Sequence, residues 1–321
     1  MTEDPLVSVI IPVRDDPAGI RQVLACLSEQ TLASHQFEII IGDDGSRSDL
    51  VPQATCKDGR IHLVTSPPRT SYSARNMAVD ISKGRVLAFC DADCLPNPQW
   101  LEEGLAAMKN ADVVAGEVIL RAPIKPTIWS LLTVDLFLDQ RQNVHFSRAV
   151  TANLVVSRKT FDDVGGFDQS LPSGGDYDFV GRSVERGARL KYSPLVVVNH
   201  PTIDRPRPFL RKVFATNFWS GARKSRDQEK MDLLGILILV PVLGVAVARR
   251  RVLRPAFTLY QERLETSGLK INFRQHMLAV VALYTLVSLA AGSGRVLGWL
   301  RGRRLLRAGK GPCYASGPDS A

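Results

Sequence analysis

In the stretch VLAFCDADCLP, residues 86–96, a short apolar run ends abruptly at two carboxylates. Residues 86–90 have the composition of a buried strand, and Asp91 and Asp93 follow it directly. Aspartate is also common in turns, so a capped turn before a helix is an alternative explanation of these residues taken alone. The sequence on either side is needed to choose between a turn and a binding site.

The first 120 residues alternate between strand patterns and helix patterns. Besides the opening stretch, strands are predicted for residues 6–13, 37–46, 60–66 and 112–120, and helices for residues 19–31, 73–84 and 98–110. Gly84 is expected to be the C-cap of the second helix. Continuous apolar strands that alternate with helices are typical of an α/β fold, with a mostly parallel sheet covered by helices on both faces.

Four carboxylates are expected at one edge of this sheet. Asp43 and Asp44 follow one predicted strand, and Asp91 and Asp93 follow another. Ligands of open α/β sheets bind beyond the carboxyl ends of the strands. A solvated edge would tolerate these acids. Their grouping at neighbouring strand ends favours a site for a cation and a sugar nucleotide.

Composition excludes several classes of protein. The chain has 321 residues, enough for one large domain or two ordinary ones. Its five cysteines are odd in number and include no C-x-x-C pair, which argues against a disulfide or zinc framework and favours a reducing compartment. The N-terminus, MTEDPLVSVIIPV, lacks a basic segment, so no signal peptide is expected.

Charge divides the chain into an acidic front and a basic back. Residues 1–204 carry 20 Lys and Arg against 26 acidic residues, whereas residues 205–310 carry 21 against five. We therefore predict an α/β domain over 1–204, a basic helical region over 205–310 and a disordered tail over 311–321. The basic region also holds apolar runs at 233–248 and 277–291, which favours membrane lipids as partners. No nucleic-acid-binding motif accompanies the charge, so nucleic acid is not expected as a partner.

The apolar runs predict membrane association without a clear crossing. A spanning helix needs about 20 apolar residues, and the runs at 233–248 and 277–291 have 16 and 15 residues. The loop between them, 249–276, carries seven basic and two acidic residues, which predicts a cytoplasmic loop. Residues 209–224 mix basic and aromatic side chains, as in an interfacial helix. Two spanning helices, or two ordinary buried helices, are the alternatives. The expected location is the cell membrane, with the catalytic domain cytoplasmic.

Six segments together carry a resemblance to a known family. In chain order they are VSVIIPVRDD, FEIIIGDDGS, SARNMAVDISKG, VLAFCDADCLPNPQWLE, VGGFDQSL and GGDYDFVGRSVERGARLKYSP. Over roughly residues 6–200 the chain resembles family 2 glycosyltransferases, which are inverting enzymes with the GT-A fold. The resemblance implies a nucleotide-sugar site formed by Pro12, Arg14, Asp44, Arg75 and Asp91.

The resemblance also implies a metal site and a catalytic base. Asp93 and Asp91, in the family's DXD motif, would bind Mg²⁺ or Mn²⁺, with His200 as a further ligand. Asp176 stands where the family keeps its base. Hard cations prefer carboxylate oxygens, and an attacking hydroxyl needs a group that removes its proton. The residue types therefore suit the chemistry.

Some positions depart from the family or have a simpler explanation. Gly175 replaces the glutamate that commonly precedes the base, so Asp178 is a rival for that role or an ordinary acid of the first helical turn. His200 alone would more often be a surface or capping residue, and Arg75 a solvated residue of a helix face. The Q-x-x-R-W signature of processive members is missing, which favours addition of a single sugar.

The sequence thus predicts a metal-dependent enzyme that moves one sugar from a UDP- or dTDP-sugar to a lipid-linked or cell-envelope glycan. A polyprenyl-phosphate glycosyltransferase and a non-catalytic GT-A-like membrane scaffold are the alternatives.

Overall fold

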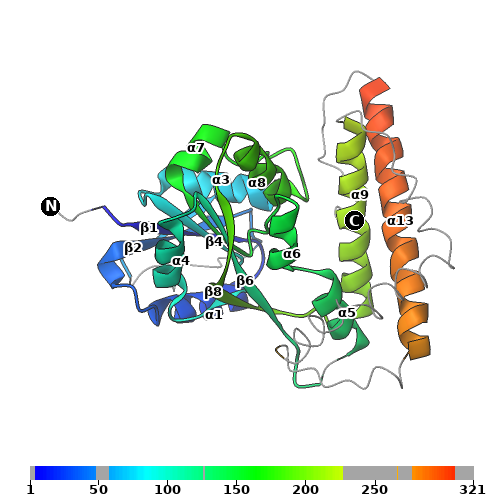
Figure 1. Ribbon diagram of the computed structural model, residues 1–321, viewed down its shortest axis with the longest axis horizontal. Coiled ribbons are helices and arrows are strands. Elements are labelled where there is room, and N and C mark those ends of the chain that lie inside the picture. Colours follow the sequence, from blue (N-terminus) through cyan, green and yellow to red (C-terminus); the bar gives the residue numbers. More distant parts are fainter. Residues whose placement is uncertain (1–3, 48–57, 126, 227–265, 267–276, 308–321) are drawn as a thin grey trace. The chain divides into compact units, whose positions relative to one another are not determined.

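A computed structural model describes residues 4–47, 58–125, 127–226, 266 and 277–307 (Figure 1). The chain divides into two compact units. The first contains residues 1–119, 138–171 and 175–201, and the second contains residues 120–137, 172–174 and 202–321. The apolar run at 233–248, most of the loop at 249–276 and the tail at 311–321 lie outside the described residues.

The described strands form a single mixed sheet. They are β1 (Val7–Val13), β2 (Phe37–Asp43), β3 (Ile61–Thr65), β4 (Val86–Cys90), β5 (Leu95–Pro96), β6 (Val113–Arg121), β7 (Asn153–Ser157) and β8 (Leu190–Pro201). Their order is β3-β2-β1-β4-β7-β6-β8-β5. The first four strands of this order pair in parallel. The pairs β4–β7, β6–β7 and β5–β8 are antiparallel.

Helices cover both faces of the sheet, as predicted. The helices of this unit are α1 (Pro17–Ser28), α3 (Ser71–Ile81), α4 (Trp100–Met108), α6 (Gln140–His145), α7 (Arg158–Val164) and α8 (Gly175–Glu185). Side chains of α1 and α4 pack with Val9 and Ile11 in one core. Side chains of α3, α7 and α8 pack with Ile10 in another, and these three helices lie together on one side of the sheet in Figure 1. Successive side chains of a strand point to opposite faces of the sheet, so β1 contributes to two separate cores.

The predicted role of Gly84 is wrong. Helix α3 ends at Ile81 with Ser82 as its C-cap, and the Gly84 N–H instead donates to the Ser8 hydroxyl at 2.8 Å. A Cβ at Gly84 would lie 2.5 Å from the Ser8 nitrogen, so glycine allows a close approach to β1. The buried Glu38 carboxylate accepts from the Ser8 hydroxyl and from the Lys83 and Gly84 N–H groups. This network joins β1, β2 and the turn before β4, because each buried polar group needs a partner.

The described part of the second unit contains two long helices and the shorter α5 (Ile128–Leu136). The long helices are α9 (Pro206–Arg226) and α13 (Met277–Arg307). A Cβ at Gly294 or Gly298 would lie 2.6 Å or 1.8 Å from the carbonyl oxygens of Phe214 and Phe218, respectively. The contacts advance together along both helices, so the helices run in the same direction. Of the helices that the structure describes, none is long and apolar enough to cross a bilayer.

Candidate active site

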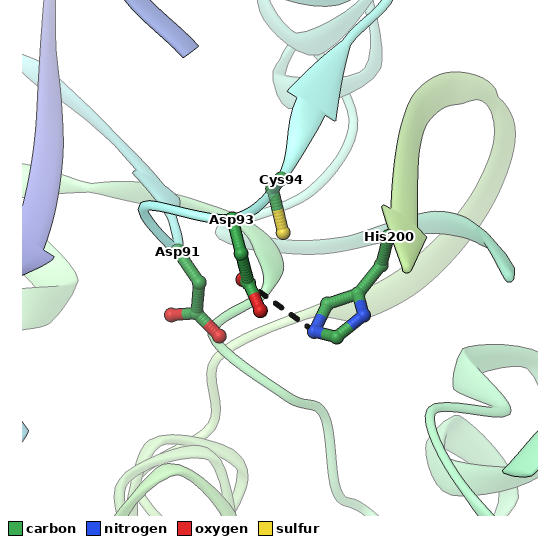
Figure 2. Close-up of side chains that lie close together, drawn as sticks. All are labelled: Asp91, Asp93, Cys94 and His200. Carbon is green, nitrogen blue, oxygen red and sulfur yellow. Dashed lines mark ion pairs between the residues drawn. The ribbon is translucent and has the colours of Figure 1, made fainter. Parts of the chain in front are cut away.

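Two carboxylates and an imidazole meet at one edge of the sheet. Asp91 and Asp93 follow β4, and His200 lies near the end of β8. One ligand atom each of Asp91, Asp93, Cys94 and His200 lies within 4.8 Å of the others (Figure 2). The structure therefore brings together the three residues that the sequence predicts as metal ligands, and it adds Cys94.

Strand pairing explains why His200 reaches this edge. The short strand β5 pairs with β8 in antiparallel register, with Leu95 opposite Asn199. The Asn199 side-chain amide donates to the Asn97 side-chain oxygen at 2.9 Å. Because β5 begins two residues after Asp93, this pairing places the next residue of β8, His200, beside the carboxylate.

The hydrogen bonding of His200 suits a metal ligand. Its Nδ1 lies 2.7 Å from the Pro201 carbonyl oxygen, and its Nε2 lies 3.6 Å from Asp93 Oδ1. A carbonyl oxygen only accepts, so Nδ1 carries the proton in this contact, and the neutral ring then has a lone pair on Nε2. An imidazole fixed through its other nitrogen is the usual arrangement at metal sites. His200 is buried, so the surface alternative is wrong.

Cys94 contributes a neutral thiol to this cluster. Its Sγ lies 3.6 Å from the Ala152 carbonyl oxygen, which can accept its proton. Burial, together with nearby Cys90 and the two aspartates, keeps the pKa of Cys94 well above its usual range. The donors that remain are two carboxylates and an imidazole, a set that fits Mg²⁺ or Mn²⁺ better than a thiolate-preferring metal.

Arg75 is a buried partner of the cluster. Only 3% of Arg75 is exposed, and its Nη2 lies 2.5 Å from Asp91 Oδ1. The alternative of a solvated helix-face residue is therefore wrong. Its buried Nε has no hydrogen-bond partner among the described residues. Arg75 thus holds Asp91 in place through its Nη2.

Asp176 and Asp178 lie in the first turn of α8 but have different surroundings. Asp176 accepts from the Tyr177 N–H at 3.0 Å and from the Tyr72 hydroxyl at 3.3 Å. Burial raises its pKa, although these donors and Arg75 oppose the shift. Asp178 instead pairs with Arg182 at 2.8 Å. The Arg182 guanidinium also binds the carbonyl of Gly166, so Asp178 supports a turn.

Three of the five residues predicted for nucleotide binding, Pro12, Arg14 and Asp44, lie near the ends of β1 and β2. Asp44 is buried and accepts from the Arg69 N–H at 2.7 Å, and its other oxygen lies 3.9 Å from the half-exposed Arg14 guanidinium. Burial raises the pKa of Asp44, and both contacts oppose that shift. Pro12 is buried within β1. Nucleotide binding by Asp44 stays a prediction.

Known proteins resemble this chain in sequence. The model of the family named glycosyl transferase family 2 matches residues 8–164. The glycosyltransferase AglE of Haloferax volcanii is 33% identical over 222 residues, which cover 65% of this chain and 71% of AglE. The chain belongs to glycosyltransferase family 2.

Two further proteins resemble this family 2 glycosyltransferase at lower sequence identity than AglE. The pre-mycofactocin glycosyltransferase of Mycobacterium tuberculosis is 30% identical over 228 residues, and the match spans 45% of that protein. The structure of a mannosyltransferase from Pyrobaculum calidifontis, solved with GDP-mannose and Mn²⁺, matches this chain with a TM-score of 0.57 at 18% identity. The match covers 94% of this chain and 88% of the mannosyltransferase chain. The latter likeness supports the GT-A fold.

Sequence reasoning about this family 2 glycosyltransferase missed Tyr72. Tyr72 precedes the helix predicted at 73–84 and belongs to no motif that marks a site, whereas the structure places it inside α3. Its ring is buried, and burial raises the pKa of the Tyr72 hydroxyl, which therefore stays a hydrogen-bond donor. Only the three-dimensional approach of α3 to α8 reveals its contact with Asp176.

Proposed function

We propose that the protein is an inverting, metal-dependent glycosyltransferase that transfers one sugar from a nucleotide sugar to a hydroxyl of a lipid-linked or cell-envelope glycan. The observation that carries this proposal is the meeting of Asp91, Asp93 and His200 within 4.8 Å. Family membership makes the chain a glycosyltransferase. Two solved GT-A neighbours were crystallised with Mn²⁺, one with UDP and one with GDP-mannose.

In the proposed reaction, the acceptor oxygen forms a bond to the anomeric carbon as the bond from that carbon to the diphosphate breaks. The acceptor proton passes to the Asp176 carboxylate, and the nucleoside diphosphate leaves with the bonding electrons. Asp91, Asp93 and His200 would hold a divalent cation, which would supply positive charge for the leaving diphosphate. Arg75 positions Asp91 through its Nη2 contact. Attack opposite the leaving group inverts the anomeric configuration.

A donor panel tests the proposal. Purified full-length enzyme is incubated with UDP-, dTDP- and GDP-sugars and a membrane lipid extract as acceptor source, and released nucleoside diphosphate is measured. We expect release from one donor class, with UDP or dTDP favoured, and loss of release when EDTA removes the cation. Undiminished release in EDTA would contradict the metal role. Mild acid treatment of the labelled product would distinguish a labile polyprenyl-phosphate sugar from a glycoside, and the labile product would overturn the hydroxyl acceptor.

We further propose that the C-terminal region lies on the cytoplasmic side of the cell membrane. Four leucines of α13, Leu286, Leu289, Leu297 and Leu300, are 38–50% exposed, and their spacing places them on one helix face. Basic residues gather at the end of the same helix, at positions 301, 303, 304 and 307. An apolar face with an adjoining basic segment is typical of helices that lie in the membrane interface.

Thiol labelling of intact cells tests this location. Thr266 is exposed, so a Thr266→Cys variant is made in a background without the native cysteines and treated with a membrane-impermeant thiol reagent. We expect labelling only after permeabilisation, because a basic loop resists export. Equal labelling of intact and permeabilised cells would place the loop outside and contradict the proposal.

A further inference from the structure

Tyr72 fills the space that a side chain at position 175 would need. A Cβ added to Gly175 would lie 2.8 Å from the nearest carbon of the Tyr72 ring. Gly175 is also the position where the resemblance leads one to expect a glutamate. The missing side chain and the aromatic ring are therefore complementary, and the ring rests directly on the first residue of α8.

The Tyr72 ring contacts both the proposed base, Asp176, and the arginine that binds Asp91. Its hydroxyl donates to Asp176 Oδ1 at 3.3 Å. The Arg75 guanidinium carbon lies 5.5 Å from the ring centroid, within the range of a cation–π contact. Arg75 in turn binds Asp91. A continuous series of contacts thus runs from Asp176 through Tyr72 and Arg75 to Asp91.

The position of Tyr72 is well determined by its surroundings. The residue is 6% exposed, and its ring centroid lies 5.7 Å from that of Phe167. The Thr70 hydroxyl caps α3 by accepting from the Ser73 N–H at 3.1 Å, which fixes the backbone on both sides of Tyr72. A side chain fixed in this way can hold a neighbouring carboxylate in one orientation.

From these contacts we infer that Tyr72 is a positioning residue: its hydroxyl orients the Asp176 carboxylate toward the acceptor, and it does so in the space that Gly175 leaves open. This inference rests on the proposed function, since it takes Asp176 as the base. A base must lie within hydrogen-bond reach of the proton that it removes. Loss of an orienting hydrogen bond should therefore lower kcat and leave the KM for the donor unchanged.

Tyr72→Phe tests the inference, because it removes the hydroxyl and keeps the ring against Gly175 and Arg75. We expect kcat for diphosphate release, with the active donor of the panel and membrane lipid extract, to fall about 10-fold, the scale of one hydrogen bond to a charged group. Tyr192→Phe is the matched control, because its hydroxyl also contacts a carboxylate, that of Glu117. We expect this control to keep the wild-type kcat.

A double-mutant cycle separates positioning from general damage. In the Asp176→Asn background, Tyr72→Phe should cause no further loss of kcat. An unchanged kcat in the single Tyr72→Phe variant, or an equal loss in both backgrounds, would overturn the inference. Full activity of Asp176→Asn would instead overturn the assignment of the base, so the two failures are distinguishable. Melting temperatures of all variants report whether the fold is retained.

Discussion

Asp93→Ala is expected to abolish cation-dependent turnover. The Asp93 side chain is 45% exposed and approaches His200 at 3.6 Å, so its removal leaves the buried cores intact while it deletes a carboxylate ligand. A metal ion that stabilises a leaving phosphate contributes several kcal/mol to the transition state. We therefore expect kcat/KM to fall roughly a thousandfold or more. Diphosphate release at a series of Mn²⁺ and Mg²⁺ concentrations measures the effect.

Asp163→Ala is the control for this variant. Asp163 is an exposed carboxylate of α7 that pairs with Lys159 at 2.5 Å. Exposed ion pairs contribute little to stability, and we expect wild-type turnover and an unchanged melting temperature. Wild-type activity of Asp93→Ala at saturating Mn²⁺ would show that the cation binds elsewhere.

Asp176→Asn is expected to retain donor binding and to lose turnover. An amide cannot accept the acceptor proton, and general-base catalysis contributes roughly 10²–10⁴-fold to a rate. The KM for the donor should change little, because the donor contacts proposed here come from other residues. Steady-state kinetics with varied donor and fixed membrane lipid extract separates the two parameters.

Asp178→Asn is the matched comparison, two residues along the same helical turn. Asp178 binds Arg182, which also binds the carbonyl oxygens of Val164 and Gly166. We expect the Asp178 variant to lower the melting temperature and to keep most of its kcat. A large loss of kcat in Asp178→Asn, together with a wild-type kcat in Asp176→Asn, would assign the base to Asp178 instead.

The parallel half of the sheet could be predicted because its signals are local. Strands β1, β2 and β4 are mostly apolar runs, and each is followed by polar or acidic residues that stop the pattern. Strand β7 was not predicted, although it lies in the middle of the sheet. The strand has only five residues, NLVVS, and it leads directly into a polar helix. Antiparallel insertion between β4 and β6 is a long-range property that no local period encodes.

The site was predictable to the same extent. Asp91 and Asp93 were placed correctly, because they follow a recognisable strand. The approach of His200 depends on β5, which has only two residues, Leu95 and Pro96, and gives no strand pattern. The position of the Tyr72 ring depends on the absence of a side chain at Gly175. Contacts of this kind come from tertiary packing, which overrides local preference.

The pairing of β5 with β8 has a consequence for cation binding at the proposed metal site. Asp93 and His200 lie more than a hundred residues apart in the chain. In an unfolded or incompletely synthesised chain these ligands are not held together, so the proposed site is complete only when β8 has paired with β5. A bound ion would then act as a cross-link between early and late segments, and it would stabilise the folded chain in proportion to the logarithm of its concentration. A metal ion at the proposed site would therefore stabilise the folded chain as well as take part in catalysis.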